Sequence, residues 1–153
     1  MALDDLENKI AAFSALDFHN ELVSVIEDNE DLLVNLQQSQ LASGFDAEGQ
    51  AVNATIYPSY SPYTIKQKKK YGVDLGAVTD RVTNYMTGAM YNSMTKQIDG
   101  DNVTTNSDVG YFPERKQWSG EKAFDLNESY RREFAEEKVI PHIQNIVADV
   151  FSK

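Results

Sequence analysis

The chain has 153 residues, a formal net charge of −10 and a pI near 4.6, and 41% of its residues are hydrophobic. A chain of this size and composition is expected to fold around a hydrophobic core, and we predict a single domain over residues 1–153. The acidic balance argues against a general DNA-coating role, because neutralising phosphates requires a basic face. The absence of cysteine excludes disulfides and thiolate metal sites, and no apolar run is long enough to span a bilayer.

Residues 1–44 have the apolar spacing of helices. A first stripe contains Leu6, Ile10 and Phe13, and a second, longer stripe contains Phe18, Leu22, Val25, Ile26, Leu32, Leu33 and Leu36. Gly44 suits the left-handed position that ends many helices. The pattern predicts one long helix from about Asn20 to Ser43.

Residues 45–110 are predicted to contain a loop, a short helix and a β-hairpin. Asp46 and Gly49 bracket a tight turn. Two runs that alternate polar and apolar residues are joined by Asp99-Gly100, which is a strong hairpin signal.

The short helix is expected over residues 62–70. Ser61 is a good N-cap, Pro62 is pre-organised for the first helical position, and Gly72 stands where a residue ending the helix is expected.

The C-terminal part is predicted to be a loop followed by a helix. Residues 111–123 lack periodicity and are expected to form a loop, whereas residues 124–153 are expected to be helical. Asp125 with Glu128 resembles a capping box, and Pro141 must kink or restart the helix. The whole pattern predicts an α+β fold, in which a long N-terminal helix and a C-terminal helix pack on a small antiparallel sheet with long loops.

Four lysines crowd the predicted short helix, at Lys66, Lys68, Lys69 and Lys70. They are too dense to share one narrow stripe, so Tyr63, Ile65 and Tyr71 are expected to hold the helix down. The segment is either a solvated helix or a phosphate contact. We favour the first, because charge runs usually face water.

The sequence offers little support for an enzyme. His19 and His142 lie far apart, neither has a metal-ligand partner four residues on, and no nucleotide-binding or nucleophile motif occurs. The "IDGDN" stretch fits a hairpin turn better than a calcium loop. We therefore expect no catalytic residues, no metal and no cofactor, although a carboxylate pair assembled by the fold stays open.

Aromatic and basic residues form the candidate interaction site. Tyrosine in a proline-rich stretch can stack on bases, but it is also enriched at protein interfaces, and in an acidic chain we favour the interface. The candidate interface residues are Tyr57, Tyr60, Tyr63, Lys66, Lys69, Lys70, Tyr111, Phe112 and Trp118.

The order of motifs resembles a family of tailed-bacteriophage neck and tail-completion proteins, also known as virion-morphogenesis or head–tail connector proteins. The resemblance extends over about residues 36–98. The matching positions are Asp46 and Gly49, Ser61-Pro62 with Thr64 and Lys66, and Thr87-Gly88 with Met90, Tyr91, Ser93 and Met94.

The resemblance implies a structural virion protein without an active site. Such subunits form rings, commonly of six or twelve copies, that join portal to tail and through which genome DNA passes. The implied partners are further copies of the chain and adjacent neck, portal or tail proteins, with no membrane and no sequence-specific nucleic acid. The implied location is the head–tail junction or tail of the virion, after synthesis in the host cytoplasm. The alternative function is a small nucleic-acid-binding protein that uses the Lys66–Lys70 helix.

Overall fold

The structure, a computed structural model, describes residues 3–52, 60–72 and 77–152. The fold is α+β, with helices and one two-stranded antiparallel sheet among these residues. Contacts divide the chain into two compact units: a helical unit, Met1–Asn29 with Arg132–Lys153, and a central unit, Glu30–Arg131. The single-domain expectation stays a prediction.

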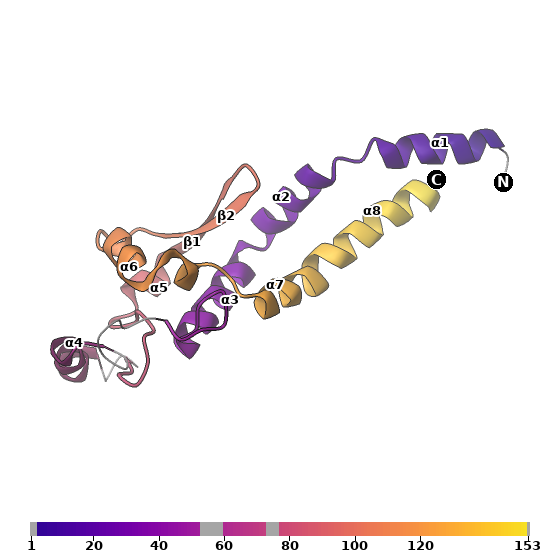
Figure 1. The fold of residues 1–153 in the computed structure, drawn as a ribbon. Helices are drawn as coiled ribbons and strands as arrows, with labels where there is room; N and C mark the ends of the chain where they lie inside the picture. Colours follow the sequence, from indigo (N-terminus) through magenta and orange to yellow (C-terminus); the bar gives the residue numbers. More distant parts are fainter. Residues whose placement is uncertain (1–2, 53–59, 73–76, 153) are drawn as a thin grey trace. The chain divides into compact units, whose positions relative to one another are not determined.

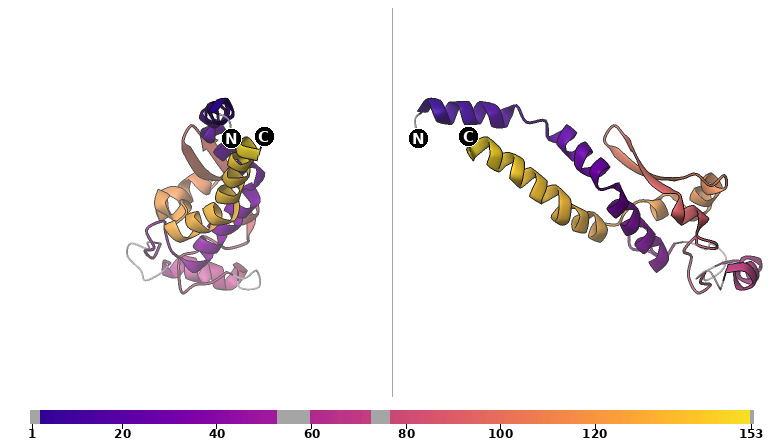
Figure 2. Two further views of the ribbon diagram at one scale, coloured as in Figure 1. Left: turned by 90° about the vertical axis from the view of Figure 1, so that its right-hand side faces the viewer. Right: turned by 180° about the vertical axis from the view of Figure 1, so that it is seen from behind.

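The helical unit is built from both ends of the chain. Its helices are α1 (Leu3–Ser14), α2 (Phe18–Asp28) and α8 (Ile140–Ser152). Helix α8 runs beside α2 and packs on α1 (Figures 1 and 2). Asp17 caps α2 by accepting a hydrogen bond from the backbone N–H of Asn20 at 3.1 Å. His142 Nε2 lies 2.8 Å from Glu21 Oε2, which joins α8 to α2.

The predicted continuous helix from Asn20 to Ser43 is wrong, because the chain leaves helical geometry at Asn29. Helix α2 ends at Asp28, and α3 covers Glu30–Ser43. The side-chain amide of Asn29 donates to the carbonyl of Val25 at 2.8 Å. The backbone N–H of Asn29 donates to the carbonyl of Ile26. Asparagine thus competes for carbonyls that a continuing helix would use.

The C-terminal segment is helical with one change of winding. Helix α7 covers Glu128–Phe134, a wider π-helical turn follows over Ala135–Val139, and α8 then begins at Ile140. The predicted interruption at Pro141 is therefore present just before the proline, whose missing N–H cannot serve a regular helix. The N-cap is Asn127 and not Asp125, because Asn127 Oδ1 accepts the N–H of Tyr130 at 3.0 Å.

The predicted hairpin is present in the central unit. Strands β1 (Met94–Asp99) and β2 (Asn102–Ser107) pair antiparallel from Met94↔Ser107 to Asp99↔Asn102. The two-residue loop is Gly100-Asp101 rather than Asp99-Gly100, since Asp99 pairs with Asn102. Gly100 takes a φ of 57°, which a glycine adopts at little cost.

The core of the central unit gathers distant segments around α3 and the hairpin. Helix α3 packs on β1 and on a 3-10 turn at Glu121–Phe124, and the four-residue helix α5 (Ala89–Asn92) leads into β1. Met90 and Met94 are buried there. The buried cluster consists of Leu41, Val52, Tyr60, Val82, Met90, Tyr91, Met94, Phe112, Ala123 and Phe124.

Two buried glutamines fasten α3 to the segment after the hairpin. Gln37 Nε2 donates to the carbonyl of Ala123 at 3.1 Å, and Gln40 Nε2 donates to that of Asp125 at 2.7 Å. Gln40 Oε1 also accepts the N–H of Asn127 at 2.7 Å. These bonds satisfy polar groups that burial would otherwise leave unpaired.

The expectation of a loop over residues 111–123 is wrong. Helix α6 covers Phe112–Ser119 and is followed by the 3-10 turn, with Gly120 at a φ of 84° between them. Pro113 lies in the first turn of α6, where its missing N–H costs nothing. Within α6 only Phe112 and Ser119 are buried, so this two-turn helix shows no apolar periodicity in the sequence.

Candidate functional site

The lysine-rich segment forms a short helix whose cap was predicted correctly. Helix α4 covers Pro62–Gln67 and continues as a π-helical turn over Lys68–Gly72. Ser61 Oγ accepts the N–H of Thr64 at 3.2 Å, which is the expected N-cap. Gly72 does not end the helix in the left-handed conformation as expected. It is buried, and a Cβ there would lie 2.7 Å from the Cβ of Ala77.

The lysines separate into three exposed residues and one buried residue. Lys66, Lys69 and Lys70 are exposed, whereas Lys68 is only 2% exposed. Tyr63 and Tyr71 do not hold the helix down as expected, since they are 71% and 55% exposed; Ile65 does pack against the core.

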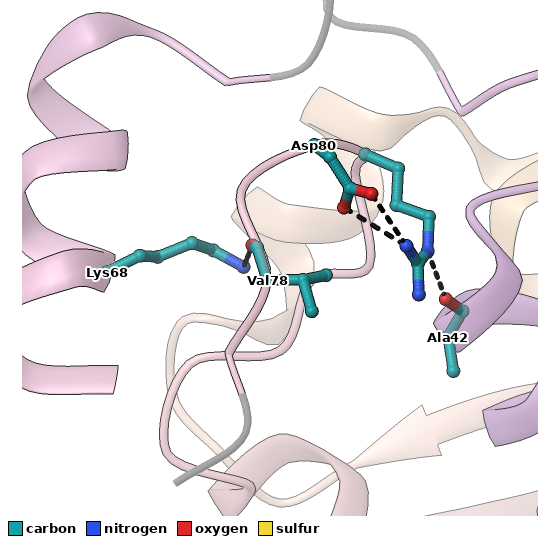
Figure 3. A network of polar contacts seen from close by, with 5 residues as sticks. Ala42, Lys68, Val78 and Asp80 are labelled. Carbon is teal, nitrogen blue, oxygen red and sulfur yellow. Dashed lines mark hydrogen bonds and ion pairs between the residues drawn. The ribbon is translucent and has the colours of Figure 1, made fainter. Parts of the chain in front are cut away.

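The side chain of Lys68 points inward in the central unit and binds the backbone of residues 78 and 85. Its Nζ donates to the carbonyls of Val78 at 3.1 Å and Tyr85 at 2.5 Å. Figure 3 shows the first of these bonds. Burial lowers the pKa of Lys68; Tyr60 acts in the opposite sense, and Arg115 lowers the pKa further.

The loop that Lys68 contacts is also held from the other side. Arg81 Nε donates to the carbonyl of Ala42 at the end of α3 at 2.7 Å, and its guanidinium pairs with Asp80 at 3.0 Å (Figure 3). Residues 78–81 are therefore bonded to the lysine-rich segment on one side and to α3 on the other.

Aromatic rings and cations form a layered cluster beside Lys68. Lys68 Nζ lies 4.1 Å from the centroid of the Tyr60 ring, and that ring stacks on Trp118 at 6.1 Å with 4° between the planes. The guanidinium of Arg115 lies 5.8 Å from the Trp118 ring. Rings of this kind attract cations through their negative faces, so the cluster positions both charges.

An open pocket of about 230 Å³ lies at this cluster. Its lining residues are Tyr60, Thr64, Lys68, Asn84, Tyr85, Met86, Thr87, Tyr111 and Arg115. Lys68 is buried at the pocket, Arg115 is half-buried, and Tyr111 is 45% exposed. Among the described residues neither Lys68 nor Arg115 has a carboxylate within salt-bridge distance. The pocket is therefore locally positive in an acidic chain.

The structure brings only part of the predicted interface together. Tyr60, Tyr111 and Trp118 lie at the pocket or its aromatic cluster. Phe112 belongs to the core, where its ring meets the Phe124 ring edge-on with 5.1 Å between the centroids. The exposed lysines Lys66, Lys69 and Lys70 and the exposed Tyr63 lie on α4 and its π-helical turn; Tyr57 falls outside the described residues.

Sequence reasoning missed the cation that completes the pocket. Arg115 lies in the segment 111–123, which the sequence predicts to be a loop, so no pattern marked it as a site residue. Its spacing of three residues to Trp118 places the two side chains on one helix face, and that signal becomes readable only once α6 is known.

Other kinds of site find no support in the described part of the chain. Residues 3–52, 60–72 and 77–152 contain no cluster of metal-ligating side chains. None of the helices described is long and apolar enough to cross a membrane. Comparison with family models, curated proteins and solved structures finds no match to this chain.

Proposed function

We propose that this chain is a structural virion protein of a tailed phage: a ring-forming subunit of the head–tail neck or tail-completion assembly that joins portal to tail. The observation that carries the proposal is the apolar surface of the helical unit. Neither α1 nor α8 contains a fully buried residue. The large apolar side chains that remain exposed in this unit are Leu3, Leu6, Ile10, Phe13, Phe18, Leu22, Ile140 and Phe151.

The exposed apolar side chains of the helical unit are large, and several of them lie close together. Leu3 is 69% exposed and Ile10 is 53% exposed on α1. The centroid of the Phe13 ring lies 5.9 Å from that of Phe18 and 6.2 Å from that of Phe151. These side chains are therefore grouped rather than scattered. Grouped apolar surface of this kind marks protein interaction sites. A subunit that assembles with copies and neighbours would cover it.

The motifs that carry the family resemblance act as structural supports in the central unit. Asp46 Oδ1 accepts the N–H groups of Glu48 and Gln50, both at 2.9 Å, and Gly49 takes a φ of 74° in that turn. Gly88 has a φ of 83° at the start of α5. These residues shape a turn and a helix start, so the motifs of the resemblance have architectural roles in this chain.

Loss of the gene in a phage that carries it tests the proposal. The expected result is filled heads and separate tails, counted by electron microscopy, with joining restored when the protein is supplied from a plasmid. Mass spectrometry of wild-type virions should detect the chain. Normal, infectious particles formed without the protein would contradict the proposal.

A nucleic-acid-binding function remains the second candidate, supported by one observation. The exposed Lys66, Lys69 and Lys70 stand beside the exposed rings of Tyr63 and Tyr71, and basic residues with aromatics can bind single strands. Fluorescence anisotropy with single-stranded DNA at physiological salt separates the candidates. Under the neck proposal, binding stays weak and replacing the three lysines with glutamine changes it little; tight binding lost in that variant supports the second candidate.

A further inference from the structure

We infer that the pocket at Lys68 and Arg115 receives a carboxylate side chain from a second copy of this chain. The inference rests on the proposed function, since it names a contact by which neighbouring subunits would join. It begins from two positive charges at the pocket that no carboxylate of the described residues pairs with.

Lys68 is a buried cation whose described contacts are neutral. Its Nζ bonds the carbonyls of Val78 and Tyr85 and faces the Tyr60 ring. Arg115 brings a second positive charge to the same pocket. Buried charge without a counter-ion is costly, so an anion entering this pocket would be stabilised more than one at the open surface.

Arg115 is placed to make the contact. The Trp118 ring supports its guanidinium, and no hydrogen bond or ion pair to the described residues occupies its donors. A guanidinium offers a planar fork of N–H groups that matches the two oxygens of a carboxylate. Two threonines, Thr64 and Thr87, and the exposed Tyr111 add polar groups around the opening.

The net charge of the two units favours the helical unit as the donor of the carboxylate. The helical unit holds eleven acidic against four basic residues, a net charge of −7, whereas the central unit holds thirteen against ten, a net charge of −3. Most of the acidic excess thus lies in the helical unit, where apolar side chains of α1, α2 and α8 are also exposed. A copy that docks its helical unit would bring acids and apolar contacts together.

The contact joins unlike surfaces, because the pocket lies on the central unit and the acids lie on the helical unit. Contacts between unlike surfaces can repeat head-to-tail from one copy to the next. Head-to-tail contacts generate closed rings when the rotation between copies closes.

Sedimentation of the full chain over a range of concentrations tests the inference. Arg115→Gln should weaken self-association about tenfold or more, in line with loss of one partner from a desolvated charge pair. Lys116→Gln is the matched control, because it removes one charge from the next position of α6 but does not line the pocket. The control should stay within about twofold of the wild type. Equal effects of the two changes, or no self-association at all, would overturn the inference.

Double-mutant cycles identify the acid. Exposed pairs in the helical unit are neutralised one at a time to Asn or Gln, alone and together with Arg115→Gln. The pairs are Asp4 with Glu7, Glu27 with Asp28, and Glu136 with Glu137. The pair that supplies the carboxylate should show an effect that is lost in the Arg115→Gln background. Additive effects for all three pairs, and for the other acids of the helical unit tested in the same way, would overturn the assignment to the helical unit.

A direct probe separates the chemistry of the pocket from assembly. NMR titration with N-acetylglutamate should shift the Arg115 side-chain and Tyr111 signals in the wild type and not in Arg115→Gln. A response to inorganic phosphate alone would overturn the carboxylate assignment. The titration tests only the carboxylate contact, whereas deletion of the gene tests the proposed function. A negative titration can therefore be told apart from a failure of the proposed function.

Discussion

Lys68 and Tyr60 together hold residues 78–85, which precede α5. Lys68 Nζ lies 4.1 Å from the Tyr60 ring centroid and bonds two carbonyls of this segment. The Tyr60 hydroxyl oxygen accepts two N–H groups of the same segment, from Thr83 at 2.9 Å and Asn84 at 2.8 Å. Lys68 therefore satisfies backbone carbonyls and Tyr60 satisfies backbone N–H groups, which burial would otherwise leave without partners.

Tyr60→Phe should destabilise the protein by about 2–4 kcal/mol. The change keeps the ring and its contacts but leaves two N–H groups without their acceptor. Tyr63→Phe is the control, because Tyr63 is 71% exposed and its hydroxyl should matter by less than about 0.5 kcal/mol. Urea unfolding measures both, and a Tyr60→Phe effect no larger than that of the control would contradict this account.

Gly72→Ala should also destabilise the protein, by about 1–3 kcal/mol. The added Cβ would lie 2.7 Å from the Cβ of Ala77 and 3.1 Å from the carbonyl oxygen of Met86. Gly110→Ala provides the comparison, since a Cβ there meets nothing within 4 Å and Gly110 has no positive φ. Thermal unfolding should show a lower midpoint for Gly72→Ala only; matching midpoints would show that the segment adjusts at little cost.

Local signals in the sequence were sufficient where the structure depends on local chemistry. The N-cap at Ser61 and the hairpin around Gly100 follow from neighbours in the chain, and both were predicted. The α+β class followed from the same patterns. The break at Asn29 was missed because the apolar spacing continues through it, while a side-chain bond to Val25 decides the local geometry.

The pocket was missed because its parts come from distant segments. Lys68, Asn84 and Arg115 are brought together by tertiary packing, and no periodicity connects them. A lysine run gives no sign that one member is buried, since that depends on the loop carbonyls it meets. Trp118 was selected for its aromatic character alone, and its stacking on Tyr60 required α6, which the sequence concealed.

Gln40→Met should cost about 1–3 kcal/mol although it conserves volume. Gln40 is 1% exposed and bonds both the Asp125 carbonyl and the Asn127 N–H, and methionine leaves these groups unpaired. Gln144→Met on the exposed face of α8 is the control and should be near neutral. Hydrogen exchange should show faster exchange at Asn127 in Gln40→Met; an unchanged rate would mean that another acceptor replaces the glutamine.

The stability of the protein should rise with pH above 8 because of Lys96. Burial lowers the pKa of Lys96 to about 8 from its ordinary value of 10.5, against an opposing effect of Asp125. Its Nζ donates to Gln37 Oε1 at 3.1 Å and Thr105 Oγ1 at 2.6 Å, which are neutral acceptors. The unfolded chain therefore binds more protons than the folded chain between these two pKa values, so the free energy of unfolding increases with pH in that window.

Urea unfolding at pH 7, 8, 9 and 9.5 measures this effect in the wild type and in Lys96→Met. The wild type should gain on the order of 1 kcal/mol relative to the variant between pH 8 and 9.5. The two proteins are compared by the slope of the free energy of unfolding against pH and not by its absolute value. Loss of the two hydrogen bonds lowers that free energy in the variant equally at every pH. The lowered pKa of Lys68 is common to both proteins and cancels. Tyr91, whose pKa burial raises, loses its proton near pH 10 in the unfolded chain but not in the folded chain, which lowers the free energy of unfolding; this contribution is also common to both proteins and cancels. Parallel curves for the two proteins would show that Lys96 keeps its ordinary pKa in the folded chain.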